Sequence, residues 1–306
     1  MTARRFGPYT LETSSEGKVL FPDSGRTKGD LIEYYQRIAP TMLRHMRGRP
    51  VTMHRFPDGI DGDGFYQKDL PGYFPKWIRR ATVAKQGGTV THALCQNAAT
   101  LVYLANQACI TPHIWLSRAD RLHQPDRLVF DLDPSDDDFD KVRRAARLVA
   151  GAMDELGMAV FLQLTGSRGI HVVSPIRRGP DFDDVRAQAR RLAAHLAGAH
   201  PDLLTVEQRI DRRGDRVYLD TARNAYAQTM TPPYAVRARR GAPVATPIRR
   251  DELDDPGLGP ARYTIGNIFR RLARIEDPWT GLNRAARALQ RVPEPAINGG
   301  ETEGAG

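Results

Sequence analysis

Short apolar, β-prone runs, interspersed with amphipathic segments of helical period, limit the fold of this chain more than any other feature. The clearest run is 127–134, Arg-Leu-Val-Phe-Asp-Leu-Asp-Pro, which a proline ends. Further strands are expected at 114–116, 159–164, 170–173 and 216–220. Apolar spacing predicts helices near 27–46, 97–110, 138–156, 183–199 and 264–275. Strands and helices mix without strict alternation, so the pattern predicts an α+β fold.

Turn chemistry refines the boundaries of these elements. Thr27 and Asp30 have the spacing of a capping box at the start of the first helix. The segment 51–75 is expected to be rich in loops, because glycines and prolines stand between its aromatic residues. The end of the chain, 292–306, is rich in Gly and Glu and is expected to be a flexible tail.

Composition excludes several classes of protein. With 41% hydrophobic residues in 306, the chain is neither collagen-like nor coiled-coil nor disordered throughout. No stretch approaches the roughly 18 apolar residues of a membrane span, and the N-terminus has no secretory signal. Cys95 and Cys109 are too few for a disulfide framework. These features predict a soluble protein of a reducing compartment, the cytoplasm, with no membrane partner.

The net charge favours a polyanionic partner. Lys and Arg number 45 against 36 Asp and Glu, a balance of +9. Neutralising nucleic-acid phosphates releases counterions, so a basic surface of this size is typical of nucleic-acid binding but does not prove it. Only six lysines occur in this arginine-rich background, among them Lys18, Lys28 and Lys68.

Asp131 and Asp133 are the sharpest chemical feature. On a strand, residues two apart point to the same face, about 6.6 Å apart, so both carboxylates could hold one or two divalent ions. The alternative is a strand end whose acids cap the next helix, a role that suits 136–138 better. Asp220 also ends an apolar run, so it is either a third ligand or the partner of Arg223.

A polar turn offers candidate phosphate ligands. Residues 165–171, Thr-Gly-Ser-Arg-Gly-Ile-His, join two expected strands, and Ser167, Arg168 and His171 could hold a triphosphate. The alternative is a tight hairpin with incidental polar residues. Arg213, Arg237 and Arg239 could neutralise phosphates, and His113 is either a ligand or a packed histidine.

The N-terminal part offers candidate DNA contacts. Lys18 and Lys28 flank a short loop that could bring both ammonium groups to one phosphate, although exposed lysines are usually only solvated. Phe65 and Tyr66 stand beside Lys68 in the glycine-rich segment. They are either core residues or a platform on which bases stack.

Taken in order, these segments resemble the polymerase domain of bacterial DNA ligase D, a member of the archaeo-eukaryotic primase superfamily. The resemblance runs from Lys18 to Trp279. It is carried by the motifs at 18–22, 27–35, 48–50, 55–61, 64–68, 113–115, 128–134, 166–171 and 233–237. It implies a primase-like polymerase fold over 1–291, with mixed or antiparallel sheets flanked by helices. Within it, 1–75 would contact DNA and 110–250 would form the catalytic core.

The resemblance also implies an activity. Such enzymes are nucleotidyltransferases of end joining that fill gaps and extend broken DNA carrying a 5′-phosphate. They take NTPs or dNTPs, often favour ribonucleotides, and use two Mn²⁺ or Mg²⁺ ions beside Ku and a ligase. Asp131, Asp133 and Asp220 would be the catalytic metal ligands. Residues near the nucleotide would be His113, Thr165, Ser167, Arg168, His171, Arg213, Arg223, Arg237 and Arg239, and those near DNA would be Lys18, Lys28, Arg55, Phe65, Tyr66 and Lys68.

Three positions depart from the family pattern. Arg168 stands where the family usually has lysine, Arg223 where it often has glutamine, and Ser15 where it often has asparagine. No ligase motif Lys-x-Asp-Gly occurs, so a separate ATP-dependent ligase is expected, with the protein at the bacterial nucleoid. Two alternatives stay open: a DNA-end-bridging protein that is weak or inactive as an enzyme, and a metal-dependent nuclease.

Overall fold

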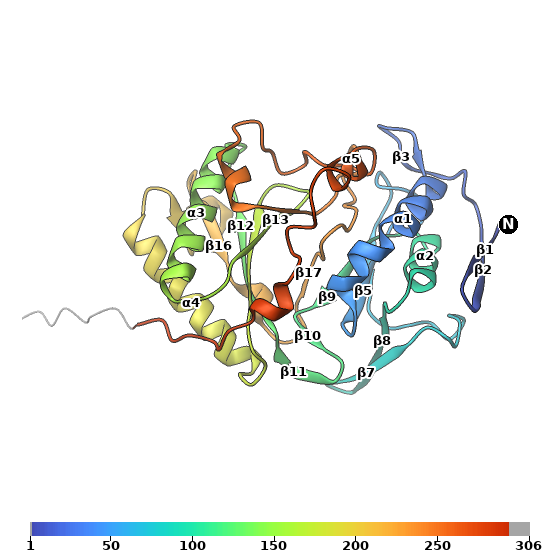
Figure 1. The fold of residues 1–306 in the computed structure, drawn as a ribbon, viewed down its shortest axis with the longest axis horizontal. Coiled ribbons are helices and arrows are strands. Elements are labelled where there is room, and N and C mark those ends of the chain that lie inside the picture. The colour runs from blue at the N-terminus through green and yellow to red at the C-terminus, as the bar shows by residue number, and fades with distance from the viewer. Residues whose placement is uncertain (1, 294–306) are drawn as a thin grey trace, which may run out of the picture.

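The computed structural model describes residues 2–293, and the rest of the tail expected at 292–306 lies outside this range. Two six-stranded sheets face each other, with one pair of helices outside each (Figure 1). The helices are α1 (Lys28–Met46), α2 (Ala98–Asn106), α3 (Phe139–Glu155), α4 (Phe182–Ala199) and the short α5 (Ile268–Leu272). Within the described range, no helix has both the length and the apolar character that a membrane crossing requires.

The first sheet, here the β12 sheet, carries α3 and α4 on its outer face. Its strands in spatial order are β15 (Leu204–Thr205), β16 (Val217–Asp220), β12 (Arg127–Asp133), β14 (Ile170–Pro175), β13 (Phe161–Leu164) and β18 (Thr246–Ile248). All neighbouring strands are antiparallel except β15 and β16. This arrangement confirms the predicted α+β fold.

The second sheet, the β5 sheet, packs with α1 and α2. Its strands in order are β17 (Thr229–Met230), β9 (Cys109–Trp115), β5 (Pro50–Arg55), β8 (Gly88–Leu94) and β7 (Arg80–Lys85), and β6 (Phe65–Gln67) pairs with the far end of β5. Three two-stranded ribbons complete the strands: β1 (Thr2–Phe6) with β2 (Tyr9–Thr13), β3 (Val19–Phe21) with β4 (Arg26–Thr27), and β10 (Ser117–Arg118) with β11 (Arg121–Pro125). The 3₁₀ turns are Ile210–Arg212, Ala222–Asn224, Arg250–Asp254 and Leu282–Ala285.

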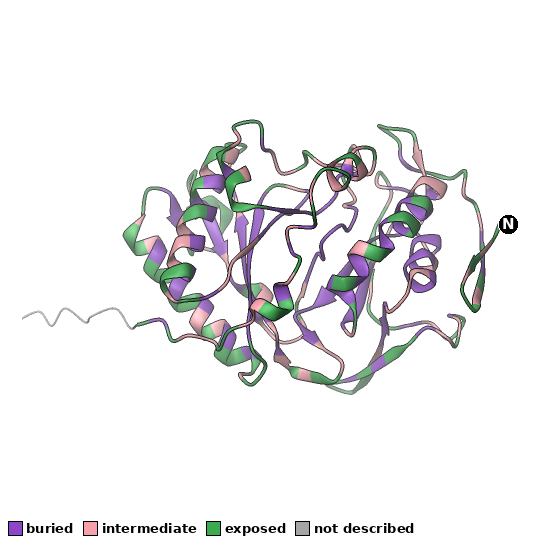
Figure 2. Cartoon of the chain, viewed as in Figure 1, coloured by how far each residue is buried: buried purple, intermediate pink, exposed green. Residues whose placement is uncertain are grey.

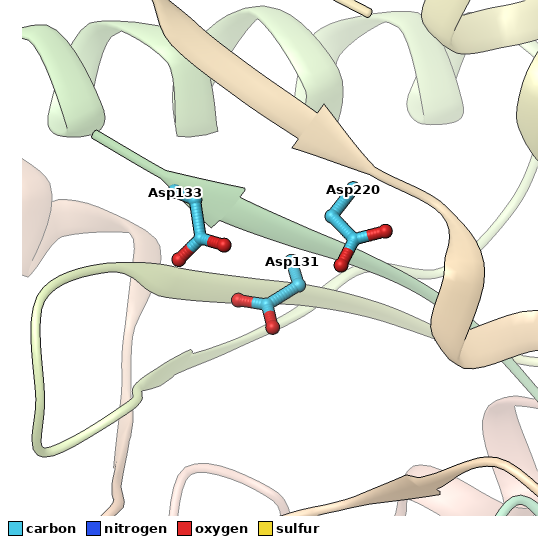
Figure 3. A group of neighbouring side chains, drawn as sticks. All are labelled: Asp131, Asp133 and Asp220. Carbon is cyan, nitrogen blue, oxygen red and sulfur yellow. The ribbon is translucent and has the colours of Figure 1, made fainter. Parts of the chain in front are cut away.

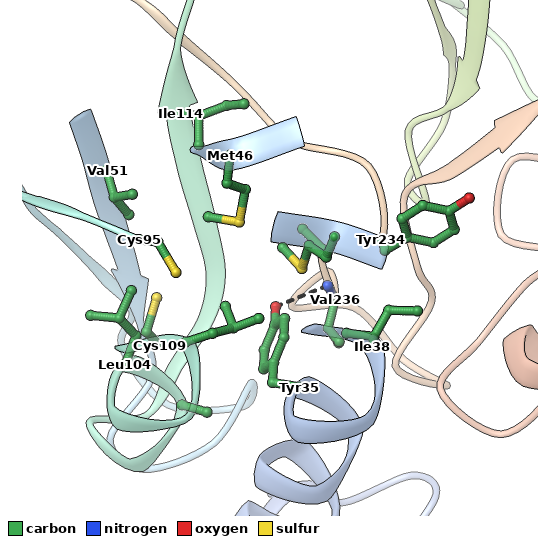
Figure 4. Close-up of a cluster of buried hydrophobic side chains, with 14 of the residues drawn as sticks. Tyr35, Ile38, Met46, Val51, Cys95, Leu104, Cys109, Ile114, Tyr234 and Val236 are labelled. Atoms are coloured by element: carbon green, nitrogen blue, oxygen red, sulfur yellow. Dashed lines mark hydrogen bonds between the residues drawn. The ribbon is translucent and has the colours of Figure 1, made fainter. Parts of the chain in front are cut away.

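Two apolar cores hold these layers together, and Figure 2 shows the buried strands between helices whose outer faces are exposed. One core lies between the β12 sheet and its helices. The other joins α1, α2 and the β5 sheet, and within it the hydroxyl of Tyr35 accepts a hydrogen bond from the Val236 amide (3.1 Å, Figure 4). Cys95 and Cys109 are free thiols in this core, and burial raises the pKa of both.

The starts of two helices were predicted correctly from local sequence signals. The predicted capping box is confirmed, because Thr27 and Asp30 bond reciprocally at the start of α1. Asp138 caps α3, which agrees with the capping role expected of 136–138.

Other expectations hold only in part or are wrong. The segment 51–75 is mostly turns and loops, as predicted, but it also contains most of β5 and all of β6. The strand expected at 114–116 begins at Cys109. The helix expected at 264–275 covers only α5, because Thr264 and Asn267 bond to nearby backbone and hold a turn instead. The tail does not begin at 292, since Val292 is buried and its amide donates to Gln188 (2.9 Å).

Candidate active site

Alternation along β12 turns its two aspartates toward the β5 sheet. Leu128, Phe130 and Leu132 belong to the core beneath α3 and α4, whereas Val129 belongs to the other core. Asp131 and Asp133 lie on the same face as Val129, because side chains two residues apart on a strand point the same way. The predicted placement of both carboxylates on one face of a strand is confirmed.

Asp220 completes a group of three carboxylates. It lies at the end of β16, directly opposite Asp131 in the ladder with β12. One oxygen from each of Asp131, Asp133 and Asp220 lies within 4.8 Å of the others (Figure 3). The ion pair considered between Asp220 and Arg223 is made elsewhere, since Arg223 Nε lies 3.3 Å from Asp131 Oδ2.

Burial and the charges around them shift the pKa values of these carboxylates. Burial, together with the charges of Asp131 and Asp220, raises the pKa of Asp133 to about 6. Burial also acts to raise the pKa of Asp131, but His171 and Arg223 hold it well below its usual range. His171 faces Asp131 across the β12–β14 ladder, with 3.4 Å between Nε2 and Oδ1. The carboxylates therefore have only partial compensation from the protein's own cations.

The donor set fits a hard divalent cation. All three residues offer carboxylate oxygens, the ligands that Mg²⁺ and Mn²⁺ prefer over nitrogen or sulfur. A cation would also relieve the repulsion that raises the pKa of Asp133. The spacing, the chemistry and the electrostatics of the group thus agree on a metal site.

Asp131 and Asp133 line a cavity of about 510 Å³ between the two sheets, and Asp220 lies beside them outside its lining. This cavity brings together most of the residues singled out from the sequence. Its lining includes Tyr66, Lys68, His113, Asp131, Asp133, Thr165, Ser167, Arg168, His171, Arg223, Arg237 and Arg239.

The polar turn between β13 and β14 forms one wall of the cavity. Thr165 Oγ1 accepts hydrogen bonds from the backbone amides of Ser167 (3.3 Å) and Gly169 (3.1 Å). A Cβ at Gly169 would lie 1.9 Å from the carbonyl oxygen of Leu132, so only glycine lets the turn approach β12. Arg237 donates to the Thr165 carbonyl (3.2 Å). The predicted hairpin is confirmed, and triphosphate binding by its polar residues stays a prediction.

The β5 sheet supplies the opposite wall. Thr52 and His113 face each other across β5 and β9, and Thr52 Oγ1 and His113 Nε2 are buried without a hydrogen-bond partner among the described residues. The ring of His54 stacks on Tyr66 at 4.1 Å. Burial, with the nearby charge of Arg237, lowers the pKa of His54 to about 4 and also lowers that of His113.

Thr52 and His54 were not predicted as site residues, because the segment 51–75 was expected to be rich in loops. A signal was available: Val51 and Met53 are core residues, and Thr52 and His54 alternate with them. Such alternation is typical of a strand with one apolar and one polar face.

Other predicted residues lie outside the lining of this cavity. Arg213 packs over the Tyr218 ring at 4.1 Å and donates to the Glu207 carbonyl. The Lys28 amide donates to the Lys18 carbonyl (2.8 Å), so their backbones are adjacent. Their ammonium groups, however, have different partners.

Lys18 Nζ lies 2.7 Å from Asp58, whereas the buried Lys28 donates to the Asn106 carbonyl (3.0 Å). Arg55 donates to Gln67 (2.7 Å) and lies over the ring of Phe65 at 5.4 Å. The contacts of all these residues with DNA or nucleotide stay predictions.

Comparison with known proteins places this geometry in a family. Residues 27–279 match the model of the LigD primase-polymerase domain. The solved structure of the polymerase domain of Mycobacterium tuberculosis ligase D in complex with DNA aligns with 90% of this chain and 99% of that domain. Its TM-score is 0.85 and its identity 32%.

Two full-length relatives give the same result. The multifunctional non-homologous end joining DNA repair protein LigD of M. tuberculosis is 34% identical over 284 residues, which are 90% of this chain and 37% of that protein. The bifunctional LigD of Bacillus subtilis is 29% identical over 273 residues, 88% of this chain and 43% of that protein. The chain thus spans less than half the length of these relatives, and it belongs to the LigD primase-polymerase domain family.

Proposed function

We propose that this chain is a metal-dependent nucleotidyltransferase that adds nucleotides, mainly ribonucleotides, to 3′ ends at gaps and breaks in DNA. The observation that carries the proposal is the group of three carboxylates, whose oxygens lie within 4.8 Å of one another and two of which, Asp131 and Asp133, line the 510 Å³ cavity. Membership of the LigD primase-polymerase domain family supports the same activity. The preference for ribonucleotides rests on the family resemblance.

Each wall of the cavity has a part in this proposal. The guanidinium groups of Arg168, Arg237 and Arg239 neutralise the triphosphate of the incoming nucleotide. Thr52 and His113 offer unpartnered polar atoms to its sugar or phosphates. Two Mn²⁺ or Mg²⁺ ions on the carboxylates would lower the pKa of the attacking 3′-hydroxyl and offset charge on the α-phosphate.

DNA contacts come from the N-terminal part. Phe65 and Tyr66 are 45% and 59% exposed, so a ring face of each is open to template bases. Lys18 and Lys28 lie beside the start of α1, where backbone amides also favour an anion such as a 5′-phosphate. Ku and a ligase are the proposed partners, since non-homologous end joining is named in the relatives, and the proposed location is the bacterial nucleoid.

The decisive experiment is extension of a labelled primer across a short gap with a 5′-phosphate. It compares NTPs with dNTPs in Mn²⁺, and the wild type with Asp131→Ala/Asp133→Ala. Extension only by the wild type supports the proposal, and the NTP to dNTP ratio tests the sugar preference. Asp137→Ala, an exposed acid nearby, is the control that keeps activity.

Two results would contradict the proposal. Shortening of the primer would identify a nuclease. Equal DNA binding by both proteins without any extension would identify a DNA-end-bridging protein.

The phosphate contact is tested separately. We expect Lys18→Ala/Lys28→Ala to lose the preference of the wild type for a 5′-phosphorylated gap over a 5′-hydroxyl gap, as measured by fluorescence anisotropy. Equal affinity of the wild-type protein for the two gaps would refute this role.

A further inference from the structure

A second cavity, of about 590 Å³, lies at the opposite end of the β12 sheet. Its lining comes from distant segments of the chain: 47–48 after α1, Leu94 and Gln96 at and after the end of β8, 118–120 and Asp126 at the β10–β11 ribbon, 175–178 at the end of β14, and Asn283 and Ala286. In the β12–β14 ladder Arg127 faces Pro175, whereas Asp131 faces His171 four residues further on. At about 3.3 Å per residue, this cavity begins roughly 13 Å from the carboxylates along the strand.

Arginines outnumber acids around this cavity. Its lining includes Arg47, Arg118, Arg177 and Arg178, with Asp120 and Asp126. Arg178 pairs with Asp120 (2.6 Å) and Arg118 with Asp126 (2.8 Å). Arg47 and Arg177 have no carboxylate partner among residues 2–293, so two guanidinium groups at the cavity have no compensating charge.

A buried arginine adds to this excess. Arg49 is fully buried (0% exposed), donates to the Trp115 carbonyl (3.2 Å) and shares the carboxylate of Asp126 with Arg118. Its Nε has no hydrogen-bond partner in the described part of the chain. Burial lowers the pKa of Arg49 against the attraction of Asp126, and the charges of Arg118 and Arg178 lower it further. The carboxylate of Asp126 is therefore the acidic partner of two guanidinium groups, those of Arg49 and Arg118.

We infer that this cavity is a second phosphate-binding site, separate from the carboxylates, which takes the phosphate group of a nucleotide. A guanidinium group binds a phosphate through two parallel N–H···O hydrogen bonds, and Arg47 and Arg177 are available for such contacts. Leu94 and Ile176 give the cavity an apolar part against which a sugar or base can pack. The phosphate belongs either to a free nucleotide or to the end of a nucleic-acid strand. Both carry the same chemical group.

The test measures binding in EDTA, so that its outcome is independent of polymerase activity. Isothermal titration with ATP is expected to find two sites on the wild type. Arg47→Ala/Arg177→Ala should weaken one of them at least tenfold and leave the other unchanged. The control is Arg144→Ala/Arg190→Ala, which removes the same charge from exposed positions on α3 and α4.

A second arm identifies the source of the phosphate. A 12-nucleotide single strand is titrated with and without a 5′-phosphate. If the 5′-phosphate strengthens binding to the wild type and only Arg47→Ala/Arg177→Ala reduces this gain, the site binds the end of a strand. If ATP binds at two sites but the 5′-phosphate gives no such gain, the site binds the free nucleotide. The inference is overturned if the variant binds both probes as the control does, with unchanged circular dichroism in all three proteins.

Discussion

The two sheets that meet at the 510 Å³ cavity differ in the charge of the side chains that they contribute. The β12 sheet presents three carboxylates, and burial, together with the charges of Asp131 and Asp220, raises the pKa of Asp133 to about 6. The β5 sheet presents Thr52 and His113, with His54 stacked behind them on Tyr66, and burial together with the charge of Arg237 lowers the pKa of both histidines. At neutral pH one wall is therefore anionic and the other is uncharged apart from its rim.

The difference has consequences for what each wall can bind. Carboxylates that repel one another gain stability when a cation arrives, so the β12 wall favours metal ions. Neutral histidine and threonine side chains carry no charge but offer hydrogen bonds, so the β5 wall suits the hydrogen-bonding groups of a substrate. A substitution that changes the charge of either wall tests this division.

The largest effect is expected from Asp220→Asn. Asparagine keeps the oxygen that accepts a hydrogen bond from the Ala222 amide (2.7 Å) but removes the charge. Mn²⁺ affinity should fall at least about 100-fold, because even residues that only support metal ligands cost about 10–100-fold when changed. In EDTA the free energy of unfolding should rise by roughly 1 kcal/mol, because repulsion of Asp133 is relieved.

Calorimetry with Mn²⁺ and urea denaturation in EDTA measure these two effects. Asp137→Asn, at an exposed position, is the control for loss of an acid. Unchanged Mn²⁺ affinity in Asp220→Asn would contradict the assignment of this carboxylate as a ligand.

A smaller effect is expected from Arg223→Gln, which restores the residue often found in the family. Arg223 Nε lies 3.3 Å from Asp131 Oδ2, so its charge opposes a metal ion at the same carboxylate. Removing it should raise Mn²⁺ affinity about fivefold, equivalent to about 1 kcal/mol. Arg223→Lys keeps the charge and should keep the wild-type affinity. If the glutamine variant binds Mn²⁺ no more tightly, Arg223 does not compete with the ion.

The last prediction concerns His54 on the β5 sheet, and its expected size is similar to that for Arg223→Gln. Its pKa is about 4 in the folded protein, below the ordinary value of 6.5. The unfolded chain therefore binds more protons between these values, and stability that is complete above pH 6.5 is lost as the pH falls toward 4. His54→Phe keeps a ring against Tyr66 and should flatten this pH dependence by roughly 1 kcal/mol. Urea denaturation at pH 7, 5.5 and 4.5 measures it, and an unchanged slope would mean that His54 titrates normally.

Much of the β12 wall could be predicted from local sequence. Alternation over 127–133 placed Asp131 and Asp133 on one face, and the turn at 165–169 was recognised from its glycines. Both signals are local: strand periodicity needs only neighbouring residues, and a glycine that permits close approach is itself visible in the sequence.

Contacts between segments far apart in the chain determined the rest of the site. The β5 strand was missed because its glycine-rich continuation resembles a loop, and it is stabilised by β8, β9 and β6 from elsewhere in the chain. Arg223 pairs with Asp131, because the turn that carries Arg223 brings its side chain to that carboxylate and not to Asp220.

The sequence by itself determined the α+β class, the spacing of the carboxylates and, through the motifs taken in order, the family. Only the tertiary structure decided that Thr52 and His113 share a cavity with Asp131 and Asp133, and that arginines from separate segments surround a second cavity. The physical reason is that periodicity sets which way a side chain points from its own strand or helix. What it then meets depends on contacts between segments far apart in the chain, which no local pattern encodes.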